Sequence, residues 1–198
     1  MPLAGRLSQA KDLGIWLHKR TTERNFPAEL RGQTALAILQ LTEDIADAII
    51  VLLDAQMPGP ALSLARPLFE GYVRGYWLLK FASDEQIPEF IAGKCPNFGG
   101  LLAAIPKDAE SGGAWIHANS AKNLTNFHDL THGGSEHVKR RIGGDSVEPR
   151  YPVQELEALL RLGNEIRVRV GCELLSLLND EEGMVSLNKR AQVLRTEP

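Results

Sequence analysis

Apolar residues recur at three- and four-residue steps along most of the chain, and alternating strand-like patterns are almost absent. This periodicity predicts four long helices that lie between proline and glycine stops. They are expected near residues 28–56, 60–82, 114–131 and 152–178. A further helix is expected over residues 3–26, and shorter helical pieces join the long ones. The pattern therefore predicts an all-α, up-and-down helical bundle.

Two of these segments, 28–56 and 60–82, are apolar almost all the way round, so we expect them to be central or to lie at a subunit contact. Pro67 interrupts the second segment and predicts either a kink or a later start of the helix. The apolar surface exceeds what one small bundle needs to bury. We therefore expect a homodimer.

Length and charge add two expectations. No repeat or linker divides the 198 residues, so we expect a single helical domain over residues 1–198. Its core is expected at about 28–178, followed by a polar, loosely held tail at 179–198. The formal net charge of −3 provides no overall attraction to nucleic acid or to an anionic membrane.

The cysteine content and the apolar segments favour a cytoplasmic protein that does not enter a membrane. Cys95 and Cys172 are far apart and supply neither a disulfide framework nor a thiolate metal cluster. The first residues lack the charged-then-apolar pattern of a signal peptide. The most apolar stretch carries Glu43, Asp44 and Asp47, which is not typical of a membrane span.

A row of charged residues lies on the apolar segment 60–82. Arg66, Glu70 and Arg74 follow one another at four-residue steps, so a helix places them on one face. Two interpretations remain open, a solvent-exposed stripe with ordinary ion pairs or a buried network. The acids Asp44 and Asp47 on the neighbouring apolar segment favour the second.

The segment NFHDLTHGG places His128 and His132 four residues apart, an arrangement that helical metal sites use. It differs from the zinc motif HExxH, because Asp129 stands where that motif has its glutamate. No third ligand is fixed by the spacing, so we expect no metal and no cofactor. Gly133 and Gly134 predict that the helix ends here.

The histidines lie beside the predicted core face of segment 114–131, within reach of both a neighbouring helix and water. We predict that this helix end brings His128 and His132 to the row of Arg66, Glu70 and Arg74. These five residues are the candidate catalytic or ligand-binding residues. In such a pocket Glu70 can fix an imidazole tautomer, and the arginines can present donors to an anion.

Two stretches, RPLFEGYVRGYWLL and LTNFHDLTHGG, resemble a group of uncharacterised bacterial helical proteins, which are domains of unknown function. Those in turn are similar to the HEPN superfamily of small helical bundles. This resemblance implies a dimer, and many such proteins are metal-independent RNases in toxin–antitoxin or phage-defence systems. Others bind nucleotides or act as assembly modules. The nearest match to the family's Arg-x4–6-His motif is Lys122–Asn123–x4–His128, where lysine replaces the arginine.

Two functions follow, and the sequence leaves open whether the protein is an enzyme. The first is an RNase or defence effector, in which His128 acts as a general acid or base. A basic patch of Lys139, Arg140 and Arg141 would then hold RNA phosphates. The alternative is a noncatalytic dimeric module that binds a partner protein or a small anionic ligand.

Overall fold

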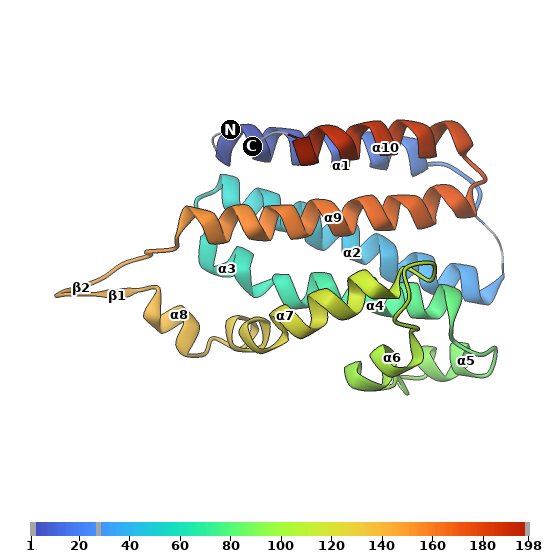
Figure 1. Ribbon diagram of the computed structural model, residues 1–198, viewed down its shortest axis with the longest axis horizontal. Helices are drawn as coiled ribbons and strands as arrows, with labels where there is room; N and C mark the ends of the chain where they lie inside the picture. Colours follow the sequence, from blue (N-terminus) through green and yellow to red (C-terminus); the bar gives the residue numbers. More distant parts are fainter. Residues whose placement is uncertain (1–2, 27–28, 197–198) are drawn as a thin grey trace.

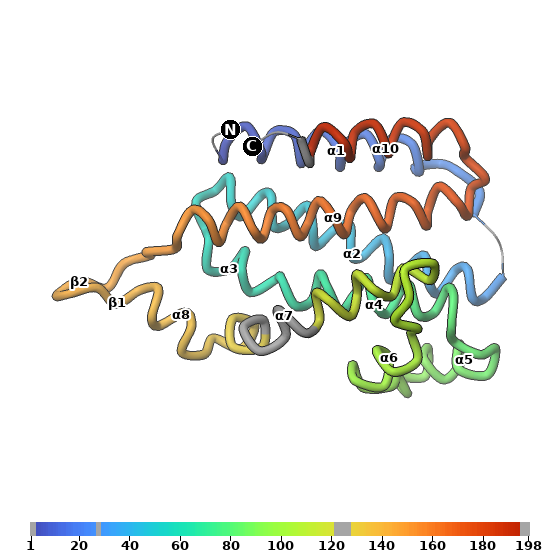
Figure 2. The backbone as a smooth tube through the Cα atoms, in the orientation of Figure 1, coloured from blue at the N-terminus to red at the C-terminus, as the bar shows by residue number. Residues whose placement is uncertain are grey.

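The computed structural model describes residues 3–26 and 29–196, and within them every side chain except those of 121–127 and 195–196. The chain folds into a bundle of helices with one short hairpin at its end (Figure 1). Its outermost pair, α1 and α10, lie side by side along one edge, as the tube in Figure 2 also shows. None of the helices in the described ranges is both long and apolar enough to cross a bilayer.

The elements follow one another in a simple order. The helices are α1 (Leu3–Thr21), α2 (Leu30–Asp54), α3 (Pro58–Ser63), α4 (Ala65–Lys80), α5 (Gln86–Ile91), α6 (Phe98–Ala104), α7 (Gly113–Thr131), α8 (Ser135–Lys139), α9 (Val153–Leu177) and α10 (Glu181–Thr196). Between α8 and α9 the chain forms a hairpin of β1 (Ile142–Gly143) and β2 (Ser146–Val147). The all-α bundle and its four long predicted helices are confirmed, and α3 and α4 together make up one of them.

The break between α3 and α4 has a local cause. Helix α3 ends at Ser63 and α4 begins at Ala65, which places Pro67 in the first turn of α4. Backbone N–H groups of a first turn have no partner within their own helix, so a proline there removes no helical hydrogen bond. The later start of the helix that Pro67 predicted is confirmed.

Helices α2 and α4 pack against each other along their lengths and form the centre of the bundle, as expected. Glycines on α4 allow this close approach. A Cβ atom on Gly75 would lie 2.7 Å from Leu39 Cδ2, and one on Gly71 would lie 2.7 Å from Thr42 Oγ1. Leu39 and Thr42 are both fully buried. The glycines on α4 therefore set the short distance between the two central helices.

The C-terminal segment differs from its expectation. The tail that we expected to be loosely held forms α10, which packs on α9 and α1 and buries Leu187 and Ala191. Asp180 secures its start, because its carboxylate accepts two 2.6 Å hydrogen bonds from Arg20 and one of 2.9 Å from Gly183 N. The few apolar positions in a polar segment were enough to dock it.

A buried arginine joins three helices. Arg167 on α9 is only 1% exposed, and its Nε donates to Glu43 Oε2 on α2 at 2.8 Å. Its Nη1 donates to the carbonyl of Ala10 on α1 at 3.0 Å, and its Nη2 donates to Asp47 on α2. Gly14 leaves room for the guanidinium, since a Cβ there would lie 2.6 Å from Nη1. The sequence indicated acids on α2 but not this partner.

Within this network, Glu43 is the residue whose negative charge is destabilised by burial. Burial raises the pKa of Glu43 to about 7, although the Arg167 guanidinium lowers it, and Asp47 raises it further. Glu43 Oε1 is buried and has no hydrogen-bond partner among the described residues. A proton on this carboxyl is therefore favoured in the folded chain.

We predict that Arg167→Met lowers the free energy of unfolding by about 3–5 kcal/mol, because Glu43, Asp47 and the Ala10 carbonyl all lose the hydrogen bonds that this buried guanidinium donates. Urea unfolding measures the effect. Arg161→Met on the same helix is the control, since the Arg161 side chain is 56% exposed and its loss should change stability by less than about 0.5 kcal/mol. Equal effects of the two substitutions would show that the network does not stabilise the fold.

Glu43 also predicts how stability depends on pH. Its pKa is higher in the folded chain, about 7, than the ordinary value of 4.5, so its proton favours folding at low pH. This contribution is complete below the ordinary value and is lost as the pH rises through about 7. Glu43→Gln should therefore flatten the fall in unfolding free energy over this window. The exposed Glu110→Gln should keep the wild-type slope.

Candidate functional site

The charged row of α4 is a pair of ion pairs that share one carboxylate. Arg66 Nε donates to Glu70 Oε1 at 2.6 Å, and Arg74 Nη2 donates to Glu70 Oε2 at 2.7 Å. The four-residue spacing on one helix face produces this arrangement directly. Glu70 thus sits between two guanidinium groups and fixes both.

The row of Arg66, Glu70 and Arg74 is neither fully exposed to solvent nor fully buried. The Glu70 side chain is 12% exposed, whereas those of Arg66 and Arg74 are 26% and 31% exposed. Burial alone would raise the pKa of Glu70, but the hydrogen bonds from Arg66 and Arg74 outweigh it and lower the pKa below its ordinary value. Glu70 therefore stays ionised at the boundary between core and water.

Helix α7 brings the histidines to this row. Arg66 Nη1 lies 2.5 Å from His128 Nδ1, and the rings of His128 and His132 are 4.6 Å apart between centroids. Because arginine can only donate, His128 Nδ1 must accept, and its Nε2 then carries the ring proton. The predicted meeting of the two segments is confirmed for His128, which contacts Arg66, whereas His132 adjoins the ring of His128. We call these two histidines with Arg66, Glu70 and Arg74 the Arg–His cluster.

The end of α7 is set by the two glycines. Gly133 has a φ of +68°, which glycine adopts at little steric cost, and Gly134 N donates to the carbonyl of Asp129 at 2.8 Å. The Asp129 side chain accepts from Glu136 N at 2.6 Å and from Ser135 Oγ at 3.2 Å, so it caps α8. Asp129 therefore has a structural role and is not free to act as a base.

His137 belongs to a structural network. Its Nε2 lies 2.7 Å from the carbonyl of Leu130, an acceptor, so this nitrogen carries the proton. The nearby Ser63 Oγ, at 3.1 Å from Nε2, consequently faces a donor and not a base. His137 Nδ1 accepts from the Tyr151 hydroxyl at 2.9 Å. This arrangement joins α3, α7 and α8 and does not activate a serine nucleophile.

The expected basic patch is largely neutralised. Lys139 Nζ lies 2.6 Å from Glu136, and Arg140 lies 2.6 Å from both Glu136 and Glu155. The hydrogen bonds from Lys139 and Arg140 lower the pKa of Glu136 to about 2. Only Glu136 is close in sequence. Glu155 comes from the first turn of α9, which sequence spacing could not place beside Arg140.

Two other sequence features can be located. Among the described side chains no group of three or more histidines, cysteines or carboxylates is arranged to hold a metal ion. Lys122 and Asn123, the nearest match to the HEPN motif, are in the stretch 121–127, whose side chains are outside the described residues. The catalytic part of that resemblance stays a prediction.

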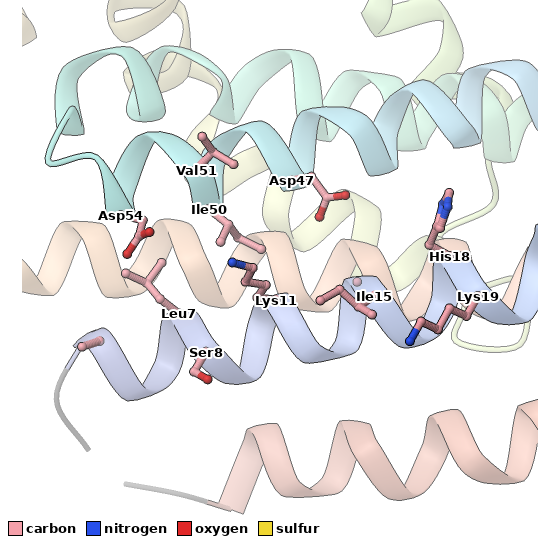
Figure 3. A pocket seen from close by; sticks show the side chains of 12 residues that line it. Leu7, Ser8, Lys11, Ile15, His18, Lys19, Asp47, Ile50, Val51 and Asp54 are labelled. Carbon is pink, nitrogen blue, oxygen red and sulfur yellow. The ribbon is translucent and has the colours of Figure 1, made fainter.

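A groove between α1 and α2 was not predicted. It has a volume of about 620 Å³, and side chains from both helices line it (Figure 3). Ile15 and Val51 are exposed on its two walls, at 45% and 65%. In the sequence Ile15 and Val51 resemble the other apolar residues of their helices. The sign of a groove is that both lie outside the helix faces that pack in the core.

A family profile matches residues 39–194, a range that includes the whole Arg–His cluster. The chain belongs to DUF6988, a family of unknown function. Comparison with curated proteins gave no match, and comparison with solved structures gave none either. The expected likeness to a domain of unknown function is thus confirmed, and the matched range runs from α2 to α10. The further likeness to HEPN proteins stays a prediction.

We predict that Glu70→Ala lowers the free energy of unfolding by about 1–2 kcal/mol at neutral pH, because two partly buried guanidinium groups lose their shared counter-charge. The pKa of Glu70 is lowered in the folded chain, so its stabilisation is present above its ordinary value of 4.5 and is lost as the pH falls below it. Thermal melting at neutral and acid pH measures both effects. Asp44→Ala on the exposed side of α2 is the control, and an equal loss there would contradict the prediction.

Proposed function

We propose that the protein binds a small anionic group, such as the phosphate of a nucleotide or of an RNA backbone, at the Arg–His cluster. The contact between Arg66 and His128 carries this proposal. It fixes the imidazole with its Nε2–H directed away from the arginine, so the ring offers a donor beside the cationic Arg66.

The charge of the cluster supports an anionic ligand. Two arginines share one glutamate, which leaves a formal charge of +1 (two minus one) before the histidines are counted. Each guanidinium carries five N–H donors, and the contacts within the cluster use only some of them. Both arginines are partly exposed, so an anion can approach without unfolding the site.

The same contact makes binding better supported than base catalysis. A general base needs an unprotonated nitrogen that faces the substrate. In His128 that nitrogen is Nδ1, and Arg66 already occupies it. His128 is therefore arranged as a hydrogen-bond donor, which suits recognition of an oxyanion.

A metal-independent RNase or defence effector is the second candidate, and the proximity of the two histidine rings favours it. With the ring centroids 4.6 Å apart, His132 would accept the proton of a ribose 2′-hydroxyl while His128 donates one to the leaving oxygen. Arg66 would stabilise the negative charge that develops on the non-bridging phosphate oxygens. This mechanism requires His128 to be an imidazolium, so Arg66 must first release Nδ1.

We predict that inorganic phosphate and a nucleoside monophosphate bind the protein at low ionic strength, as measured by titration calorimetry. Arg66→Ala and His128→Ala should each weaken binding by about tenfold or more, a loss of about 1.4 kcal/mol. Arg161→Ala removes a more exposed arginine of α9 and should leave binding unchanged. The proposal would be overturned if neither phosphate nor the nucleoside monophosphate bound, or if Arg161→Ala weakened binding as much as Arg66→Ala.

The same preparations decide between the two candidates. Cleavage of single-stranded RNA in EDTA that disappears with His132→Ala would establish the RNase. Phosphate binding without cleavage leaves the protein as a noncatalytic anion-binding module.

A further inference from the structure

The hairpin between α8 and α9 projects beyond the end of the bundle (Figure 1). Its principal contacts are between its own two strands. Two further backbone hydrogen bonds extend its base, from Glu148 N to the carbonyl of Arg141 at 2.9 Å and from Arg150 N to that of Arg140 at 2.8 Å. We call residues 140–150 the ribbon.

The two faces of the ribbon differ. Gly143 and Ser146 are opposite each other on one face, and the Arg150 side chain covers them. Its Nη2 donates to Ser146 Oγ at 2.6 Å, and a Cβ on Gly143 would lie 2.2 Å from its Nη1. Ile142 and Val147 are opposite each other on the second face and are 59% and 78% exposed. The polar face is closed by its own chain, whereas the apolar face is open.

An open apolar face on such a short ribbon needs a partner. A two-stranded hairpin by itself is only marginally stable in water, and its apolar face is normally packed against another layer. Val138 and Val153, which flank the ribbon in the sequence, are also exposed, at 51% and 52%. Exposed apolar side chains that gather in one place favour an interaction site, and Ile142 and Val147 lie opposite each other on one face of the ribbon.

The groove between α1 and α2 has the complementary pattern. Its two walls carry opposite charges, with Lys11 and Lys19 on α1 and Asp47 and Asp54 on α2. The charged side chains border an apolar floor, which includes Leu7 and Ile50. Figure 3 shows these walls facing each other across the groove. An occupant therefore needs an apolar face with a basic edge and an acidic edge.

The ribbon has this order of charges. Arg141 precedes β1, whereas Asp145 precedes β2. Glu148 follows β2 but is held on the polar face, where Arg150 Nη2 lies 2.6 Å from its Oε1. In the single chain Arg141 Nη2 lies over Gly59 of α3, and Asp47 is paired with Arg167. When β1 lies along the α2 wall, Arg141 turns from Gly59 to Asp54 of α2, and Asp145 faces the lysines of α1. The same orientation places Ile142 against Val51 and Val147 against Ile15, so four exposed apolar side chains become covered. The reverse orientation brings like charges together.

We propose that the ribbon docks in the α1–α2 groove of a second copy of this chain, whose own ribbon docks in the groove of the first. Both complementary surfaces are present on one chain, and an exchange related by a two-fold axis uses both and leaves neither open. The occupant is thus a second copy, which also accounts for the apolar surface that a single bundle leaves exposed.

The first test is the mass of the full chain in solution. Sedimentation should give twice 21.8 kDa for the wild type, and the double substitution Ile142→Ser with Val147→Ser should give a monomer with an unchanged circular dichroism spectrum. The fold survives because both side chains are exposed in the single chain. Val185→Ser on α10 removes a valine that is 56% exposed and should stay dimeric. A monomeric wild type, or a double variant that remains dimeric, overturns the proposal.

The second test identifies the docking site. Val147→Cys and Ile15→Cys are prepared as separate proteins and oxidised alone and as a mixture, with the wild type, which carries Cys95 and Cys172, as the blank. The mixture should give a disulfide-linked pair that neither variant gives alone. A crosslink of Val147→Cys with itself would mean that two ribbons stack on each other and overturns docking in the groove. Absence of any crosslink above the blank overturns it as well.

Charge reversal tests the orientation. Arg141→Glu and Asp54→Arg should each weaken the dimer by about tenfold, and the chain that carries both should recover most of the loss. If the combined chain is weaker than either single variant, the orientation is wrong.

Discussion

The guanidinium of Arg167 is the constraint on which the arrangement of α1, α2 and α9 depends. A charge that is only 1% exposed must be paired, so these helices have to present the Ala10 carbonyl, Glu43 and Asp47 to it at once. Gly14 on α1 leaves room for the guanidinium, since a Cβ there would lie 2.6 Å from its Nη1. Arg167 thereby joins α1 and α2, the two helices that line the groove.

The Arg–His cluster is assembled by a second set of close packings. Glycines on α4 let it approach α2, and α7 in turn packs on α4, which brings His128 to Arg66. The charged row consequently lies where the core meets water. At such a boundary the donors of the ion pairs remain accessible to a ligand, because Arg66 and Arg74 are 26% and 31% exposed. The family profile of DUF6988 spans all of these residues.

The histidine turn and the ribbon are parts of one continuous piece of chain. Asp129, next to His128, caps α8, and Arg140 at the end of α8 begins the ribbon. Arg140 is held between Glu136 and Glu155, which ties this piece to the start of α9. The two surfaces for which we propose functions are therefore connected through a single short helix, whose ion pairs neutralise Lys139 and Arg140.

The sequence by itself determined the helices, the break at Pro67, the shared face of the charged row and the helix end at the glycine pair. Each of these depends on residues within about one or two helical turns, where spacing fixes geometry. Only the tertiary structure decided that Arg167 meets Glu43, that Arg140 meets Glu155, that the polar tail docks as α10 and that a hairpin projects before α9. Contacts between distant segments depend on how whole helices pack, and the periodicity of any one segment does not encode its partner.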